Sequence, residues 1–163
     1  MKRKYLILFS LSGFVLALDQ LTKNLVYLNL DPGAERTFGG GVLTLSRTYN
    51  TGFAFGLISR APDSLKDVFF LGIPVFALVL IVLIFIKLQD NQLLTSSALT
   101  LLLAGAVGNL IDRAQYGYVI DFIRLNFWGL RMPPFNIADL SIVVGVILMV
   151  VGTLLAGRAK AHG

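Results

Sequence analysis

Carboxylates are the side chains of this sequence whose type and placement support hydrolytic chemistry. The sequence has no cysteine, and its one histidine, His162, is the second residue from the C-terminus. It has no H-E-x-x-H motif, no His/Cys cluster of a zinc site and no glycine-rich phosphate-binding motif. Two carboxylates in a low-dielectric site do not readily both ionise, so one keeps a proton while the other is a base. Such a pair suits amide hydrolysis, in which the base activates a water and the acid protonates the carbonyl or the leaving amine.

Asp121 and Asp139 are the two carboxylates that the chain order allows to meet. Asp139 falls in the first turn of the last long apolar stretch, and Asp121 falls in the segment that leads back towards it. Pro133 and Pro134 lie between them and bend the chain. The sequence allows these aspartates to approach each other and leaves their separation open.

Further polar residues occur near the ends of the apolar stretches. Asp19 and Lys23 are four residues apart, so they share one helix face. Asn109, Asp112 and Arg113 have i, i+3, i+4 spacing and also share a face. At 1.5 Å per helical residue, all five are expected in the outer third of the bilayer. In one interpretation, these five residues surround a site hidden from lipid. In the other, the longer and more terminal side chains extend to water at the membrane surface; these are Lys23, Asp112 and Arg113. Both interpretations stay open.

The composition is that of a membrane protein. The 163 residues are 56% hydrophobic and 14% charged, and the apolar residues occur in long uninterrupted blocks. The net charge of +5 does not indicate nucleic-acid binding, because the basic residues form no stripe interleaved with aromatics. Ala104 and Gly108 form a small-xxx-small pair that favours close helix packing. We expect one polytopic membrane domain over residues 1–163, with spans at about 5–30, 68–86, 93–111 and 137–156.

The first span has an alternative interpretation as a cleavable secretory signal. Three basic residues precede the apolar run, and Ala17 lies near a weak cleavage site. However, the apolar pattern resumes after Asp19 and continues to Leu30, which favours a helix of about 39 Å. That helix exceeds the hydrocarbon thickness of about 30 Å, so we expect it to tilt or to protrude.

The distribution of positive charge predicts the orientation. Six Lys and Arg residues occur in the 17 residues of 1–4, 87–92 and 157–163, whereas seven occur in the 62 residues of 31–67 and 112–136. Basic residues concentrate in cytoplasmic segments, so both termini are predicted to be cytoplasmic.

The two extracytoplasmic segments have strand signals. Residues 42–49 alternate Thr and Ser with larger side chains, which predicts a strand, and residues 125–132 are consistent with a second strand or hairpin. The predicted fold class is therefore a membrane all-α core of four transmembrane helices with a small extracytoplasmic β-containing segment.

Five segments of the chain resemble, in order, the motifs of the lipoprotein signal peptidases, the signal peptidase II family. The first begins at residue 19 and the last ends at residue 139. They are Asp19-Gln20-Leu21-Thr22-Lys23, Asn50-Thr51-Gly52-Phe53-Ala54-Phe55-Gly56, Gly105-Ala106-Val107-Gly108-Asn109-Leu110-Ile111-Asp112-Arg113, Gly117-Tyr118-Val119-Ile120-Asp121-Phe122 and Phe135-Asn136-Ile137-Ala138-Asp139. Leu140 departs from the pattern, because the family often has a small residue there.

The resemblance implies an intramembrane aspartyl endopeptidase that removes the signal peptide of diacylglyceryl-modified prolipoproteins. It implies cleavage on the N-terminal side of the lipidated cysteine, near the outer face of the bacterial cytoplasmic (inner) membrane. Asp121 and Asp139 match the family's catalytic pair. The implied substrate-binding or supporting residues are Asp19, Lys23, Asn50, Gly52, Asn109, Asp112, Arg113, Asn136 and Ala138.

The resemblance implies no metal and no organic cofactor. The partners it implies are the prolipoprotein substrates, membrane lipids and peptide inhibitors of the globomycin type, with no nucleic acid. We also expect residues 52–57 and an interfacial helix at about 63–70 to cover the site.

Two other functions are compatible with buried carboxylates. In a small proton- or ion-coupled transporter, Asp19, Asp121 and Asp139 would relay charge, but the inner two-thirds of the spans offer almost no ionisable group to continue the path. In a non-enzymatic assembly or lipid-binding protein, the aspartates would form a structural polar network.

Overall fold

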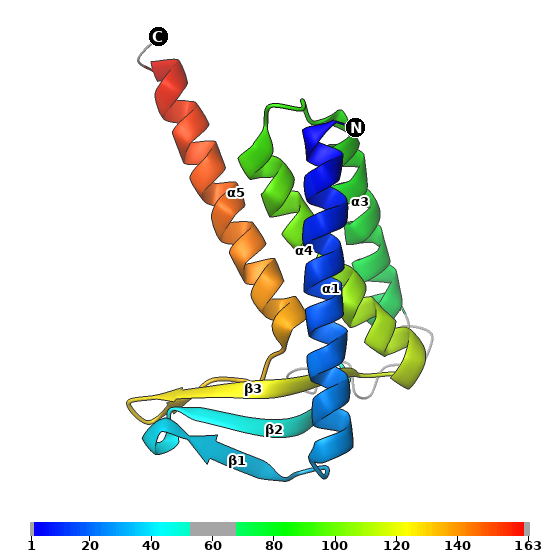
Figure 1. Cartoon of the computed structure of the whole chain (residues 1–163), viewed down its shortest axis with the longest axis vertical. Helices are drawn as coiled ribbons and strands as arrows, with labels where there is room; N and C mark the ends of the chain where they lie inside the picture. Colours follow the sequence, from blue (N-terminus) through cyan, green and yellow to red (C-terminus); the bar gives the residue numbers. More distant parts are fainter. Residues whose placement is uncertain (1, 53–67, 162–163) are drawn as a thin grey trace.

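The computed structural model describes residues 2–52 and 68–161. Four long helices run roughly along one direction, and a β-sheet lies across one end of them (Figure 1). Both chain termini lie at the opposite end. The helices are α1 (Arg3–Asn29), α3 (Ile73–Lys87), α4 (Leu93–Tyr116) and α5 (Ile137–Ala161).

All four helical regions are long and apolar enough to cross a bilayer, so the predicted set of four membrane helices is confirmed. A short π-helical turn, η2 (Val68–Gly72), precedes α3 and completes the second span. Pro74 stands in the first turn of α3, a position where a missing backbone N–H is tolerated. The helix α4 continues five residues past the predicted end at 111 and stops at Gly117, whose φ of 75° ends the helix. Asp112 is therefore helical.

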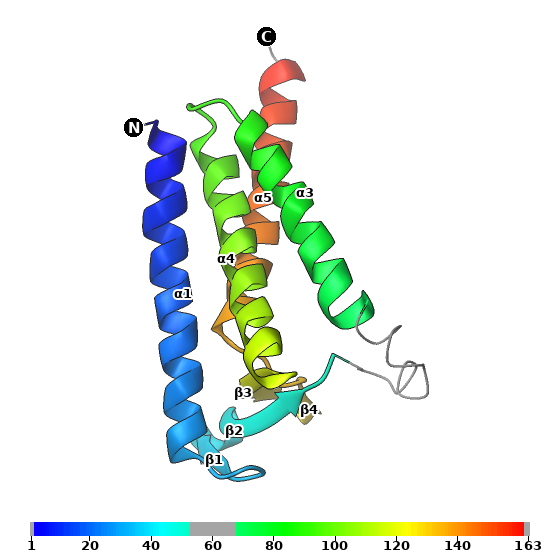
Figure 2. The same cartoon turned by 90° about the vertical axis from the view of Figure 1, so that its right-hand side faces the viewer.

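The helix α4 lies at the centre of the bundle and packs against α1, α3 and α5 (Figure 2). Small residues allow its close contacts, as the small-xxx-small pair predicted. A β-carbon at Gly108 would lie 2.7 Å from the Asp19 carboxylate on α1. One at Gly145 of α5 would lie 2.9 Å from the carbonyl oxygen of Ala98 on α4. The side chains that α1, α3 and α5 turn away from α4 are mostly apolar and exposed, as expected for surfaces that face lipid.

The sheet has four antiparallel strands in the order β1-β2-β3-β4. They are β1 (Glu35–Phe38), β2 (Leu43–Asn50), β3 (Val119–Phe127) and β4 (Leu130–Arg131). The strand predicted at 42–49 is confirmed as β2. The hairpin expected at 125–132 is confirmed by the pairing of β3 with β4, but its first strand begins earlier than expected, at Val119. Its first residues are buried on both faces and so lack the alternation that marks a half-exposed strand.

The sheet is fixed to the end of α1 by apolar packing and by a helix cap. Val26 and Leu30 form a buried cluster with Phe122 of β3. Arg47 of β2 donates to the carbonyl oxygens of Tyr27 and Leu30 at 2.9 and 3.2 Å. Those carbonyl groups have no partner within the helix at its C-terminus, so Arg47 satisfies them. The sheet is thereby held at a defined level relative to the helix ends.

Candidate active site

Asp121 and Asp139 converge at the sheet end of the bundle, where Asn136 binds both. The Asn136 side-chain amide donates to Oδ1 of Asp121 at 2.7 Å, and its backbone N–H donates to Oδ2 of Asp139 at 3.2 Å. Oδ1 of Asn136 in turn accepts from the backbone N–H of Asp139 at 2.9 Å. This reciprocal pair is a capping box at the start of α5. The local signal that begins a helix thus also orients a carboxylate.

Asp121 is buried on β3, with a side chain that is 1% exposed. Oδ2 of Asp121 accepts from Nδ2 of Asn50 at 2.8 Å, and Oδ1 of Asn50 accepts from the backbone N–H of Gly52 at 2.8 Å. Gly52 has a φ of 73°, a conformation that suits glycine. The turn at Gly52 therefore fixes which end of the Asn50 amide faces the carboxylate.

The environment of Asp121 favours its protonated form. Burial raises the pKa of Asp121 to about 6, the hydrogen bond from Asn50 partly opposes this, and the negative charge of Asp139 adds to the rise. The hydrogen bond from Asn136 also opposes the rise. A carboxyl group with this pKa still holds its proton in mildly acidic solution and is able to act as an acid there.

A cleft of about 280 Å³ opens onto Asp121. Residues of β2, of the turn after it and of the segment before α5 line this cleft: Thr48, Tyr49, Asn50, Thr51, Pro133 and Pro134. A larger cavity of about 570 Å³ lies between α1 and α4, where it touches Lys23 and Asp112 and neither of the converging aspartates. The smaller cleft is therefore the one placed for chemistry at Asp121.

Asp139 is half-buried in the first turn of α5 and is held from α4 as well as by Asn136. The Asn109 amide donates to Oδ1 of Asp139 at 2.8 Å. Oδ1 of Asn109 accepts from Nδ2 of Asn136 at 3.1 Å and from Nζ of Lys23 at 3.1 Å. Asn109 thus connects the buried cation on α1 with the carboxylate of Asp139.

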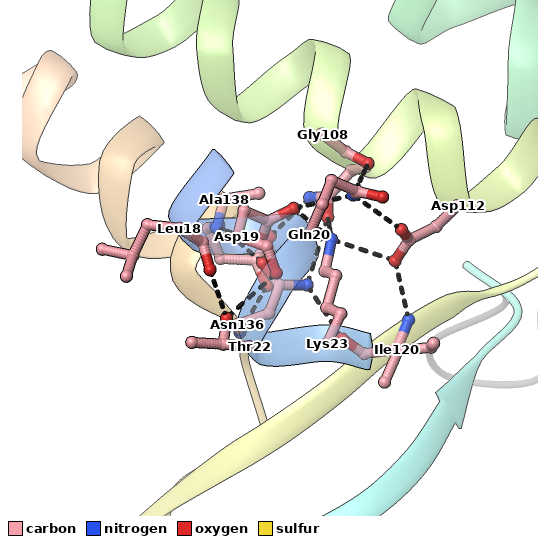
Figure 3. A network of polar contacts seen from close by, with 12 residues as sticks. Leu18, Asp19, Gln20, Thr22, Lys23, Gly108, Asp112, Ile120, Asn136 and Ala138 are labelled. Atoms are coloured by element: carbon pink, nitrogen blue, oxygen red, sulfur yellow. Dashed lines mark hydrogen bonds and ion pairs between the residues drawn. The ribbon is translucent and has the colours of Figure 1, made fainter. Parts of the chain in front are cut away.

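Lys23, Asp19 and Asp112 form a buried ion cluster between α1 and α4 (Figure 3). Nζ of Lys23 lies 2.8 Å from Asp19 and 2.9 Å from Asp112, and the lysine is 2% exposed. The second interpretation, extension to water, is therefore wrong for Lys23 and Asp112. Two carboxylates and one ammonium group leave the cluster with a formal charge of −1, so backbone donors are needed to stabilise it.

Those donors come from the residues immediately before the two converging aspartates. Oδ1 of Asp19 accepts from the backbone N–H of Ala138 at 2.9 Å, and Oδ2 of Asp112 accepts from the backbone N–H of Ile120 at 3.0 Å. The ion cluster therefore holds the start of α5 and the start of β3 at fixed positions. This explains how residues 18 positions apart in the chain are brought to one point.

Gln20 belongs to the same network, although it was not among the predicted site residues. Its Nε2 atom lies 3.1 Å from the carboxylates of both Asp19 and Asp112, and 3.3 Å from the carbonyl oxygen of Gly108. Gln20 stands beside Asp19 in the first quoted motif, so its membership of that motif was the available signal. It adds a neutral donor between two like charges.

Arg113 does not join these contacts in the way its helical spacing suggested. Its guanidinium carbon lies 5.0 Å from the ring centroid of Phe70, and its Nε is buried without a hydrogen-bond partner among the described residues. Within residues 2–52 and 68–161, it makes no ion pair with Asp121 or Asp139. Leu140, the departure from the family pattern, is 46% exposed and so does not crowd the site.

The expected covering segments fall mainly on residues 53–67, which lie outside the described residues. The described part of the expected interfacial helix, residues 68–70, belongs to η2. Among the described residues, no group of three or more His, Cys, Asp or Glu side chains is arranged to hold a metal ion.

Comparison with known proteins shows the family of the chain. The family described as "Signal peptidase (SPase) II" matches residues 11–155. The chain is 36% identical over 163 residues to a lipoprotein signal peptidase of Enterococcus faecalis, covering 100% of this chain and 97% of that protein. It is 38% identical over 139 residues to that of Moorella thermoacetica, covering 85% of this chain and 87% of that protein.

Two solved structures of bacterial membrane enzymes also resemble it. One superposes with a TM-score of 0.79 at 38% identity, covering 93% of this chain and 92% of the other. The second has a TM-score of 0.80 at 36% identity, covering 96% and 90%. The chain therefore belongs to the lipoprotein signal peptidase family and is a multi-pass bacterial membrane enzyme, a signal peptidase II of the aspartic peptidase family A8.

Proposed function

We propose that this enzyme removes the signal peptide from diacylglyceryl-modified prolipoproteins, with Asp121 and Asp139 as its catalytic pair. The observation that carries the proposal is that Asn136 hydrogen-bonds to both carboxylates beside a cleft that opens onto Asp121. Cleavage is on the N-terminal side of the lipidated cysteine, so the leaving group is the nitrogen of that cysteine.

In the first chemical step, the Asp139 carboxylate takes a proton from a water molecule. The water oxygen attacks the carbonyl carbon of the residue before the cysteine, while Asp121 donates its proton to the carbonyl oxygen. The product of this step is a tetrahedral diol. The raised pKa of Asp121 supports its role as the acid, and the two N–H groups that bind Asp139 support its role as the base.

In the second step, the diol collapses and the carbon–nitrogen bond breaks. Asp121 takes a proton from one hydroxyl of the diol, and Asp139 gives its proton to the cysteine nitrogen. Both carboxyl groups then return to their starting protonation states, and no other reactant is consumed besides water.

The remaining predicted site residues support the pair in this proposal. The ion cluster of Asp19, Lys23 and Asp112 positions the backbone on either side of the site. A separate set contacts or orients the carboxylates or the substrate: Asn50, Gly52, Asn109, Arg113, Asn136 and Ala138. The surrounding lipids and globomycin-type peptide inhibitors are proposed partners of the same site.

The orientation is part of the proposal. Both termini are cytoplasmic and the sheet end is extracytoplasmic, which is supported by the six basic residues in segments 1–4, 87–92 and 157–163. The whole chain then acts as one polytopic membrane domain in the cytoplasmic membrane. A diacylglyceryl group in the outer leaflet lies at the depth of the site, so the scissile bond approaches sideways from lipid.

The direct test uses purified full-length protein and a diacylglyceryl-modified prolipoprotein. Wild type is expected to release the signal peptide with a new N-terminus at the lipidated cysteine, identified by mass spectrometry. Asp121→Asn and Asp139→Asn should remain folded and lose cleavage. Asp31→Asn, which changes an exposed aspartate in the turn after α1, should cleave normally. Undiminished cleavage by either active-site variant removes that residue from the mechanism.

A further inference from the structure

The end of the sheet farthest from α1 exposes a group of large apolar side chains. We call this group the sheet tip. Trp128 is fully exposed and Leu130 is 70% exposed. The members of the sheet tip are Phe38, Val42, Phe127, Trp128, Leu130 and Met132. Exposed apolar residues on the four helices face lipid, but the sheet tip lies outside the spans and needs a separate explanation.

The sheet tip is one continuous feature built from two neighbouring turns. Phe38 pairs with Leu43 at the turn between β1 and β2, and Phe127 pairs with Leu130 at the turn between β3 and β4. The two turns are joined by a hydrogen bond of 2.8 Å from the backbone N–H of Asn126 to the carbonyl oxygen of Val42. The strands run crosswise to the helices, and the tip extends sideways beyond the start of α5 (Figure 1).

The backbone at Trp128 has a strained, positive φ angle, and no packing of its side chain within the described residues offsets that strain. Trp128 and Gly129 form a two-residue hairpin loop with φ angles of 47° and 81°. Such loops favour Asn or Gly, because a side chain with a β-carbon is disfavoured at positive φ. The Trp128 ring lies 6.3 Å from the ring of Phe127, which is itself exposed. A bulky aromatic in this conformation with no burial indicates a contact outside the chain.

The depth of the sheet relative to the lipid bilayer identifies that contact. The 27 residues of α1 span about 40 Å, whereas the hydrocarbon layer is about 30 Å thick, so the last turns of α1 reach the headgroup layer. The sheet packs on those last turns through Val26 and Leu30. Tryptophan concentrates at this level, and the exposed Arg131 beside the tip is able to pair with the phosphate group of a phospholipid.

We propose that the sheet tip inserts into the membrane at the boundary between headgroups and acyl chains. The partner is the lipid surface next to α5, not a second copy of the chain or a protein substrate. The insertion anchors the far end of β3, whose other end carries Asp121. This lipid contact does not depend on the catalytic roles proposed above, so either proposal stands if the other fails.

The fluorescence of Trp128 tests this proposal directly, because Trp128 is the one tryptophan of the sequence. The experiment places single copies of the full-length protein in nanodiscs of phosphatidylcholine and phosphatidylglycerol, without substrate. Compared with N-acetyltryptophanamide in water, the emission should be blue-shifted and protected from iodide. Phospholipids brominated on their acyl chains near the glycerol should quench it. Water-like emission with full iodide access overturns the proposal.

A matched control moves the tryptophan to the other end of the sheet. The Trp128→Phe/Asp31→Trp variant places it in the exposed turn after α1, at the lower edge of the molecule in Figure 1. Its emission should be water-like, with several-fold stronger iodide quenching than wild type. A second variant, Leu130→Asp, puts a charge at the tip and should increase iodide access to Trp128. A blue shift that appears only after prolipoprotein is added, or only with two copies in each disc, assigns the tip to another partner and overturns the proposal.

Discussion

The side-chain amide of Asn136 donates a 2.7 Å hydrogen bond to the carboxylate of Asp121, from a position three residues before Asp139. A capping residue of α5 therefore reaches across to a strand and binds the second carboxylate of the site. Because one asparagine contacts both carboxylates, its replacement should disturb the positions of both.

We predict that Asn136→Ala lowers kcat/KM by roughly 10- to 100-fold, because the partners that orient a reacting group typically contribute that much. The hydrogen bond from Asn136 lowers the pKa of Asp121, so its removal should move the transition assigned to Asp121 in the pH–rate profile to higher pH. The measurement is kcat/KM against pH. Asn91→Ala, in the exposed turn before α4, is the control and should leave the profile unchanged.

The raised pKa of Asp121 predicts a pH-dependent cost in stability. The folded protein holds this proton up to about pH 6, whereas the unfolded chain releases it near the ordinary value of 3.8. The free energy of unfolding is therefore highest below about pH 4, where Asp121 is protonated in both states. It falls as the pH rises to about 6, because the folded protein must then keep or lose a proton that the unfolded chain has already released. Asp121→Asn removes this loss, so it should be more stable than wild type above pH 6 by about 1–3 kcal/mol.

Thermal unfolding of both proteins in detergent between pH 4 and pH 8 checks this prediction. The difference in Tm should be small near pH 4 and should grow to a plateau above pH 6. A difference that is the same at every pH would mean that the burial of Asp121 has no electrostatic cost.

We predict that Lys23→Met destabilises the protein by about 3–5 kcal/mol, because it leaves Asp19 and Asp112 buried without their cation. The double variant Lys23→Met/Asp19→Asn should recover part of this loss, since it also removes one of the two carboxylates. Lys87→Met, at the exposed end of α3, should change stability by less than about 0.5 kcal/mol. Unfolding temperatures report all three, and an unchanged Lys23→Met would disprove the ion cluster's stabilising role.

Close packing of α4 against α5 predicts a strong effect at Gly105. An added β-carbon there would overlap the carbonyl oxygen of Ala138, the residue before Asp139. Gly105→Ala should therefore shift the start of α5, lower kcat/KM by at least about tenfold and destabilise the protein by about 1–3 kcal/mol. Gly13→Ala is the control, because nothing lies within 4 Å of its new methyl group, and it should be neutral or slightly stabilising. Equal activity of the two variants would contradict the packing argument.

The sequence by itself determined the parts of this protein that depend on local pattern. Uninterrupted apolar runs predicted the four helices, and alternation predicted β2, because both signals repeat within a few residues. The same pattern failed at Val119–Ile120, where burial on both faces removes alternation and hides the start of β3. The family motifs selected Asp121 and Asp139, although no local signal contained the distance between them.

The tertiary structure alone decided which polar residues meet. Asp19 and Lys23 lie on α1 and Asp112 lies on α4, so their ion cluster exists only because Gly108 lets these helices approach closely. The backbone N–H groups that complete the cluster come from Ile120, eight residues after Asp112, and from Ala138, 119 residues after Asp19. Helical spacing places a side chain on a face of its own helix, but its partner is set by how the helices dock. That is why Lys23 is buried in the cluster, whereas Arg113, one residue after Asp112, stays outside it.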